Sequence, residues 1–455
     1  MLIALPRSFA GLLLTSLFLS VSAYSQNGNY VRNTENGAAP GQDNTVIGFE
    51  AGAVLDDNST QNVFLGRKTG KGPATARQNV ILGYNAFSGS FASVAGNVAI
   101  GNSIGTNLSS PSGEVYGNVV IGAAAGLTLK GNYSTYIGMA AGSNGGSSAV
   151  TDNFNSFFGA FAGSSNQNAQ NTFLGSYAGS QNIEGSANVM IGFNSGRYST
   201  NSFGSSASQS VFVGNESGRN AGGQNCTFVG YKAGTATGGY STGNLNVAVG
   251  YQSSPSLVYG MNNTTLGSNS GFSNRDGSDN VFLGAYSGYS NTTGGANTYI
   301  GSSAGGIGRN SEKLQNATAI GFRAFVGVSY GLVLGDTTGT NVGIGTAYPN
   351  QRLTIRGNMN FLTASNLRFD NSPFLDINQN RLALGGEKGE FPVEITSSLR
   401  YKVAAENQWA DYVFAPDFRK LSLKDVAAFI QQNGHLPGIP SAKEVIQNGV
   451  DAAQM

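Results

Sequence analysis

The sequence predicts a mainly β protein, in which a parallel β-solenoid of about 18 coils is followed by a small α+β domain. The phrase NVFLG at residues 62–66 recurs in close copies from NTVIG at 44–48 to NVGIG at 341–345. Most closing glycines of these phrases are 16 to 18 residues apart, and the spacers between phrases are rich in Asn, Gly, Ser and Thr. A period that persists over about 300 residues is typical of a stacked array of coils.

The first 25 residues have the features of a secretory signal peptide. Arg7 precedes an apolar run at residues 9–21, and small residues up to Ala23 provide a cleavage site. The alternative is an uncleaved membrane anchor, but the run is shorter than the ~20 apolar residues that span a bilayer. We therefore expect an exported protein, extracellular or on the cell surface, with no transmembrane segment once residues 1–25 are removed.

Residues 26–43 are a polar lead-in without a period, and residues 44–345 form the predicted solenoid. The residue after Asn is mostly β-branched and the residue before Gly is aliphatic, as in Val63 and Leu65. Residues two apart in a strand share a face, so these two columns line one side of the sheet. The middle column, which contains Phe64, faces the other side. Either the opposite wall of the same coil or a neighbouring chain must cover this second face, and we expect an oligomer.

The Asn that opens the phrase is the candidate structural site. Stacked strands lie ~4.8 Å apart, which allows the side-chain amide of one coil to bond to that of the next. We therefore predict a ladder of Asn side chains along the solenoid. Its predicted members are Asn44, Asn62, Asn79, Asn97, Asn118, Asn155, Asn171, Asn188, Asn246, Asn263, Asn280, Asn297 and Asn341.

Two features predict turns at the ends of the strands. Many phrases are followed by a second glycine, as in Gly175 and Gly179, and such pairs fit tight corners with positive φ. The spacers vary in length, as at residues 165–170 and 290–296, which is typical of loops that project from a solenoid. These loops and the outer face of the solenoid are the surfaces that a ligand would contact.

The repeat ends after Gly345, and the next segment alternates apolar and polar residues in short runs. We predict a β-rich neck over residues 346–392. Its expected strands include residues 353–355, 367–369, 375–377 and 381–384.

Residues 393–455 form a predicted α+β end domain. SLKD at 422–425 is a capping box that begins a helix ending at Gly434. SAKE at 441–444 begins a second helix, which ends at Gly449. The strand on which these helices pack is predicted at Trp409, Tyr412, Val413 and Phe414.

The phrases of the type NTVIG, together with their Ala-Gly corners, resemble the head repeats of trimeric autotransporter adhesins. The resemblance covers about residues 44–345, and the period here is longer than the usual repeat of that family. It implies a left-handed parallel β-roll in which three chains lie side by side as a homotrimer.

A second resemblance concerns the C-terminal part. The segments NVGIGTAYPNQRLTIRGN and WADYVFAPDF, and the ending HLPGIPSAKEVIQNGVDAAQM, are similar to a tail-fibre-type domain of secreted bacterial proteins. This resemblance implies an end piece that nucleates a trimer. A coiled coil commonly follows the segment in that group, and none is expected before Met455.

The composition argues against most catalytic and cofactor chemistry. The net charge is +1 and charged residues make up 11% of the chain, so no nucleic-acid surface is expected. The only histidine, His435, lies between the two predicted helices, where we expect a polar cap. The repeats lack the paired carboxylates of glycosidases, the Asp-rich repeats of calcium-binding rolls and a phosphate-binding GK[ST] motif. We therefore predict no enzyme activity, no cofactor and no metal.

Cys226 is the only cysteine, so no disulfide can form within the chain. It occupies the position of the opening Asn in the phrase CTFVG. We expect a small buried side chain, and the alternative is an intermolecular disulfide.

These observations predict a structural and adhesive fibre that binds surfaces or partner cells through many weak contacts. Its ligand is a surface, a glycan or a protein. A second hypothesis is a tail-fibre subunit of a phage or contractile injection machine, but the signal peptide argues against it because such machines assemble in the cytoplasm. A third is an ice-binding solenoid, which needs regular Thr columns, whereas Thr alternates with Val here.

Overall fold

The computed structural model describes residues 31–34, 41–106, 114–129, 131–143, 153–200, 206–237, 239–336, 338–358, 365–369, 372–378, 381–384 and 416–448. The chain forms two compact units, residues 1–356 and 357–455. The predicted signal peptide, most of the lead-in and the predicted strand at Trp409 to Phe414 lie outside the described residues.

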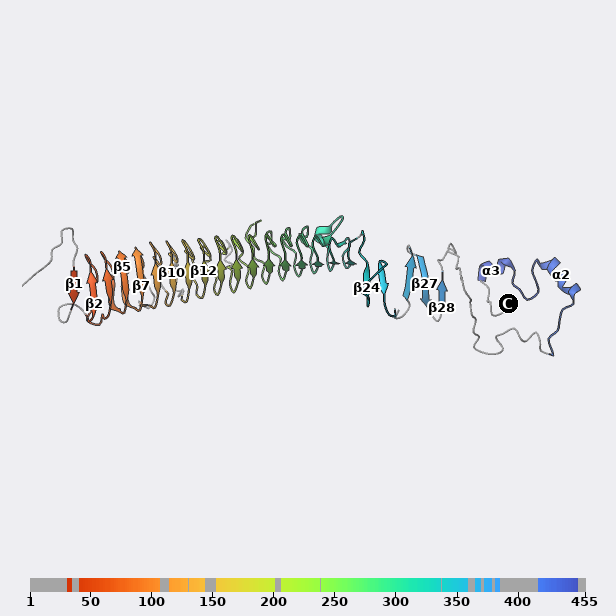
Figure 1. Ribbon diagram of the computed structural model, residues 1–455, viewed down its shortest axis with the longest axis horizontal. Coiled ribbons are helices and arrows are strands. Elements are labelled where there is room, and N and C mark those ends of the chain that lie inside the picture. The colour runs from red at the N-terminus through yellow and green to blue at the C-terminus, as the bar shows by residue number, and fades with distance from the viewer. Residues whose placement is uncertain are drawn as a thin grey trace, which may run out of the picture. The chain divides into compact units, whose positions relative to one another are not determined.

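The first unit is a parallel β-solenoid whose coils stack along one axis (Figure 1). Its main sheet has 18 strands, of which β1 (Val31–Thr34) is antiparallel to its neighbour β2, so 17 parallel strands remain. The parallel strands are β2 (Asn44–Ile47), β3 (Val63–Leu65), β5 (Val80–Tyr84), β7 (Val98–Asn102), β9 (Val119–Ile121), β10 (Thr135–Ile137), β11 (Ser156–Phe158), β12 (Thr172–Leu174), β13 (Val189–Ile191), β14 (Val211–Val213), β15 (Thr227–Val229), β16 (Val247–Val249), β17 (Thr264–Leu266), β18 (Val281–Leu283), β19 (Thr298–Ile300), β21 (Thr318–Ile320) and β23 (Leu332–Leu334).

Successive phrases pair in register, so that each position of the phrase forms a column along the sheet. In β11 and β12, for example, Phe157 lies beside Phe173 and Phe158 beside Leu174. The mainly β class and the parallel solenoid predicted from the repeat are therefore confirmed.

The solenoid has about 15 turns, fewer than the 18 coils predicted from the sequence. The last phrase leaves the main sheet, because β24 (Val342–Ile344) pairs in parallel with β25 (Leu353–Ile355) in a separate two-stranded sheet. The coil before it is short, and Asp336 caps a tight turn there. The last phrase of the repeat therefore lies outside the main sheet.

Short additional elements line other sides of the coils. The strands β4 (Pro73–Arg77), β6 (Phe91–Ala95) and β8 (Glu114–Tyr116) form a parallel sheet, and β20 (Gly305–Gly306) pairs with β22 (Phe325–Val326). A 3-10 helix spans Ser311–Lys313.

The core of the solenoid is the middle column of the phrase, which is buried inside a single chain. The rings of Phe157 and Phe173 stack with centroids 4.7 Å apart, and those of Phe212 and Phe228 stack at 5.1 Å. The opposite wall of the same coil covers this column, so the middle column does not require a neighbouring chain. Burial raises the pKa of Tyr299 in this column to about 12.

The corners depend on glycine in a backbone region that other residues avoid. Gly175 has a φ of 136°, and a Cβ at this residue would lie 2.5 Å from the carbonyl oxygen of Gly192 in the next coil. At Gly179, a Cβ would lie 2.5 Å from the Phe173 ring. The first glycine therefore permits close stacking of the backbones and the second leaves room for the core ring.

In the second unit, β26 (Ser365–Phe369), β27 (Ser372–Asn378) and β28 (Arg381–Leu384) form an antiparallel meander. The helix α2 spans Leu423–Asn433 and α3 spans Ala442–Asn448. The Ser422 hydroxyl accepts a hydrogen bond from the Asp425 amide, and Gly434 ends α2 with a φ of 73°. Both predicted helices are present, and no residue of α2 is buried among the described residues.

Candidate functional site

Buried Asn side chains form a ladder along the solenoid. The side-chain nitrogen of Asn79 donates to Oδ1 of Asn62 at 2.9 Å, and the Asn79 backbone N–H donates to the same oxygen at 3.0 Å. The same Asn79 nitrogen also donates to the carbonyl of Val94 across the coil at 3.1 Å. Each amide therefore bonds to the previous coil and to the opposite wall of its own coil, which makes the ladder a structural element.

The ladder passes through most of the predicted residues. Its buried members from that prediction are Asn44, Asn62, Asn79, Asn97, Asn118, Asn155, Asn171, Asn188, Asn246, Asn263, Asn280 and Asn297. The expectation for Asn341 is wrong, because this residue is exposed and donates to the carbonyl of Pro349 at 3.1 Å. Its phrase lies outside the main sheet, so no stacked coil offers it a partner.

Small residues continue the ladder where Asn is absent, and the sequence analysis missed two of them. The Asn155 backbone N–H donates to the hydroxyl of Ser134 at 3.1 Å, and that of Cys226 donates to the hydroxyl of Ser210 at 3.1 Å. Cys226 is itself buried and free, and burial raises its pKa to about 11. The prediction of a small buried side chain is confirmed for Cys226. The sequence does mark these two serines, because Ser134 and Ser210 occupy the position of the opening Asn in their phrases.

A second row of buried Asn residues was not predicted. Asn291 donates to Oδ1 of Asn274 in the previous coil at 3.1 Å and to the carbonyl of Gly294 at 3.0 Å. Asn182 similarly donates to Oδ1 of Asn166 at 3.4 Å. Each of these residues lies seven positions after a closing glycine, a spacing that could have revealed them.

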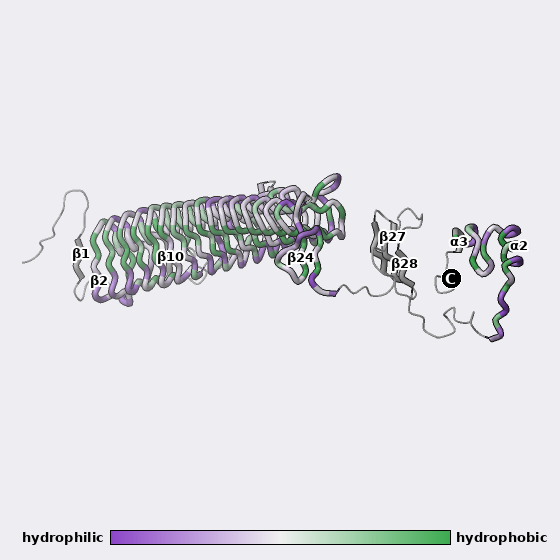
Figure 2. The backbone as a smooth tube through the Cα atoms, turned by 45° about the vertical axis from the view of Figure 1, so that its right-hand side comes forward, coloured by the Kyte–Doolittle hydropathy of each residue, from purple (hydrophilic) through white to green (hydrophobic). Residues whose placement is uncertain are grey.

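The outward-facing residues of the main sheet form a continuous surface that we call the aliphatic stripe. It consists of the residues on both sides of the buried middle column in the 17 parallel strands, and none of them is charged. The residue before Gly is apolar in each of these strands, whereas the residue at the start of the strand phrase is Thr or Ser in eight of them and mostly Val in the others. Figure 2 shows hydrophobic residues recurring at the same place in successive coils. The most exposed members are Val63, Leu65, Ile100, Leu174, Leu266, Val281, Leu283, Ile320, Leu332 and Leu334. Leu174, for example, is 48% exposed, so nothing in the described chain covers this face.

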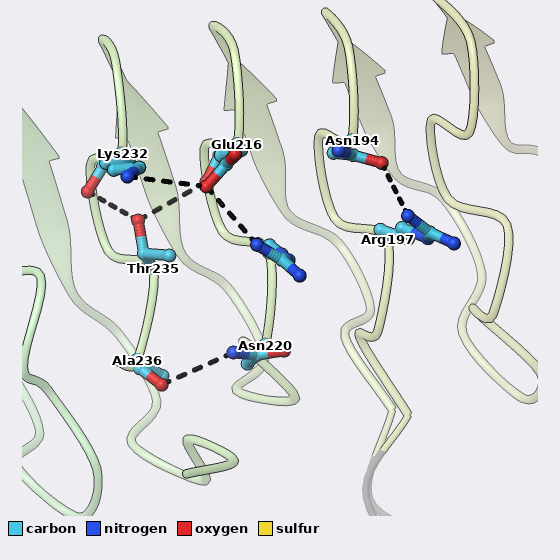
Figure 3. Close-up of polar contacts among 8 residues, drawn as sticks. Asn194, Arg197, Glu216, Asn220, Lys232, Thr235 and Ala236 are labelled. Atoms are coloured by element: carbon cyan, nitrogen blue, oxygen red, sulfur yellow. Dashed lines mark hydrogen bonds and ion pairs between the residues drawn. The ribbon is translucent and has the colours of Figure 1, made fainter. Parts of the chain in front are cut away.

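Charged residues gather instead at the corners of the coils. Figure 3 shows Asn194, Glu216 and Lys232 at the same position of successive coils. The Glu216 carboxylate is 3.4 Å from Nη1 of Arg219 and 3.8 Å from Nζ of Lys232. The Arg197 guanidinium lies 4.4 Å from the centroid of the Tyr177 ring. These contacts are partly exposed; the Glu216–Arg219 pair lies within one coil, and the other two link neighbouring coils weakly.

A polar groove crosses four consecutive coils at the loop edge of the solenoid. It has a volume of about 460 Å³. Its lining consists of Thr237, Ser256, Ser273, Arg275, Asp276, Thr292 and Thr293. We call this feature the hydroxyl groove, because five of its seven side chains carry hydroxyl groups.

His435 lies between α2 and α3 in the second unit. Its ring lies edge-on to Phe429 with centroids 5.5 Å apart, and its Nδ1 is 3.1 Å from the carbonyl oxygen of Leu436. No group of three His, Cys, Asp or Glu side chains able to hold a metal occurs among the described residues. In the same residues, no helix is long and apolar enough to cross a membrane.

The fold and its surfaces define a parallel β-solenoid protein with a buried amide ladder and one uncovered aliphatic face. No protein-family model matches the chain, and neither a curated protein nor a solved structure matches it. Its function is therefore argued from its own surfaces.

Proposed function

We propose that the protein is an exported, non-catalytic fibre that assembles as a homotrimer and attaches cells to surfaces or to other cells. The aliphatic stripe is the observation that carries this proposal. It runs along the main sheet without a charged residue, and members such as Leu174 and Leu283 are 48% and 40% exposed. Soluble monomers rarely expose apolar patches larger than a few hundred Å², so this face fits contact with further copies of the chain.

The choice of three chains follows from the resemblance of the repeats to trimeric adhesin heads. In such an arrangement the stripes face one another, and the corners and loops with their charged and aromatic residues remain outside. The same chemical groups then recur on three sides and at each coil. Attachment through many weak contacts on one rigid body gives a high overall avidity.

The assembly is tested by the molar mass of the purified chain lacking residues 1–25, measured by light scattering after size exclusion. We expect the mass of three chains. The double variant Leu174→Lys/Leu283→Lys places cations in the stripe and should yield single chains, because a buried unpaired charge is costly. A mass of one chain for the unmodified protein would contradict the trimer.

The control variant is Met139→Lys/Ile307→Lys, at two apolar residues that are 51% and 50% exposed and lie outside the stripe. It should remain trimeric. Attachment is measured in parallel as retention of protein-coated beads on cells and abiotic surfaces, where the trimer should exceed the single chains by more than tenfold. Equal retention of both forms would remove the multivalent mechanism.

A further inference from the structure

We propose that the hydroxyl groove binds a short neutral saccharide, an inference that rests on the proposed attachment function and names its ligand class. The groove combines hydroxyl donors, one carboxylate, one guanidinium and nearby aromatic rings. Its volume of about 460 Å³ lies within the usual range for small-molecule sites.

The hydroxyl groups of the groove are available to a ligand. The hydroxyl of Thr292 donates to the carbonyl of Glu312 at 3.3 Å. Those of Ser256, Ser273 and Thr293 have no hydrogen-bond partner within the described chain. A hydroxyl both donates and accepts, which matches the hydroxyl groups of a sugar.

The two charged residues of the groove suit a neutral ligand better than an anion. Arg275 and Asp276 lie beside each other, with Nη1 3.7 Å from Oδ2, so their charges largely balance. Oδ1 of Asp276 is buried and accepts no hydrogen bond from the described residues. The Asp276 side chain is 31% exposed, and an ionised carboxylate has about four acceptor positions, so it has spare capacity to accept from a ligand hydroxyl.

The backbone holds this loop in place without a ligand. The amides of Arg275, Asp276 and Gly277 all donate to the carbonyl of Thr292, at 3.0, 3.0 and 3.2 Å. In the next coil, the amides of Thr292 and Thr293 donate to the carbonyl of Glu312 at 3.0 Å. A groove fixed in this way loses little conformational entropy when it binds.

Aromatic residues adjoin two residues of the groove lining, Arg275 in space and Ser273 in the chain. The Arg275 guanidinium is 6.0 Å from the centroid of the Tyr259 ring, which is 58% exposed. Phe272 directly precedes Ser273, and its ring stacks on Tyr289 at 5.0 Å. The C–H face of a pyranose packs on such rings while its hydroxyls reach polar groups, a combination that a peptide backbone or a phosphate does not use.

Ligand-observed NMR and calorimetry on the chain lacking residues 1–25 test this inference. The probes are cellobiose, lactose and N,N′-diacetylchitobiose, with inorganic phosphate and a Gly-Ser tetrapeptide as the anion and peptide arms. At least one disaccharide should bind. Asp276→Asn should weaken its binding by about tenfold or more, because the acceptor loses its charge and one of its two oxygens becomes a donor nitrogen.

The matched control is Asp279→Asn, on the same loop, because Asp279 is exposed and its side chain accepts from Nδ2 of Asn262 at 3.1 Å outside the groove. It should bind the disaccharide as the unmodified chain does.

Three results would overturn the saccharide site: binding of none of the disaccharides, binding of phosphate or peptide alone, or equal affinity in Asp276→Asn. If the trimer attaches to cells and Asp276→Asn does not change saccharide binding, the saccharide site is refuted and the proposed function is not. A single chain that binds a disaccharide but does not attach refutes only the proposed function.

Discussion

At the scale of single residues, the solenoid depends on left-handed backbone positions that the sequence marks only in part. In one coil, Gln170 before the ladder and Tyr177 at the corner have φ values of 64° and 59°, although neither is glycine. Of the left-handed positions in this coil, only the corner glycines can be recognised from the sequence. The ladder amides compensate the cost of these positions, because each satisfies buried backbone groups of two coils.

The ladder residue Asn171 provides a test at this scale. Its Oδ1 accepts from the backbone and side-chain nitrogens of Asn188 at 3.0 and 3.1 Å. Asn171→Ala leaves the Asn188 backbone N–H buried without a partner, and the Asn188 side-chain nitrogen keeps only the carbonyl of Ala207, so we expect a loss of about 3 kcal/mol in the free energy of unfolding. Urea denaturation measures the loss, and hydrogen exchange should show faster exchange at the Asn188 amide.

The control is Asn341→Ala, which removes the Asn of a similar phrase at an exposed site. It should cost less than about 1 kcal/mol. If both variants lose the same stability, burial in the ladder is not what makes Asn171 important.

At the scale of elements, strands of three residues have no independent stability and gain it from their neighbours. The strand β12 pairs with β11 on one side and β13 on the other, and its Phe173 lies in the core. The turn after β23 closes the stack differently, since it is held by one carboxylate.

That turn gives a prediction of pH dependence. The hydroxyls of Thr338 and Thr340 and the amide of Gly339 donate to the carboxylate of Asp336 at 2.6, 3.0 and 3.0 Å. These bonds, that of Thr338 first, hold the pKa of Asp336 well below its ordinary value of 3.8. Because the folded pKa is depressed, the turn gains stability above pH 3.8 and loses it as the pH falls through the lower folded value.

The measurement is the carboxyl ¹³C shift of Asp336 as a function of pH. It should stay at its ionised value after the pH has fallen below 3.8, the ordinary pKa of this carboxyl. Asp336→Asn should abolish the difference in turn stability between about pH 3 and about pH 6. A titration of Asp336 at its ordinary value of 3.8 would contradict the hydrogen-bonded turn.

At the scale of the solenoid, each coil contacts its two neighbours, so stability is close to a sum over coils. Removal of one whole coil, residues 172–188, joins Asn171 directly to β13 and preserves the spacing of the phrases. We expect this shortened chain to fold, with Phe157 stacking on Met190 and only a small decrease in the urea midpoint.

The control deletion removes residues 172–179, a part of the same coil. It leaves residues 180–188 as half a coil, so this segment meets the neighbouring coils out of register, while the later phrases keep their spacing. This variant should be unfolded or aggregated by circular dichroism and light scattering. Equal stability of the two deletions would show that register between coils is not what holds the stack.

The sequence determined much of this protein by itself. The repeat of the phrase predicted the parallel solenoid, its columns and most of the Asn ladder, because a stacked fold repeats the same environment at each coil and therefore the same residue types. Ser422 and Gly434 marked the ends of α2 for a local reason, since caps act within one turn.

Only the tertiary structure decided which face of the strand is inside and which groups meet across coils. The alternation of Val63, Phe64 and Leu65 fits either orientation, and the corner glycines settle it by leaving space for the middle ring. The departure of Asn341 from the stack and the hydroxyl groove also depend on contacts between residues far apart in the chain. Such contacts leave no periodic signal, because loops of different lengths bring them together once each.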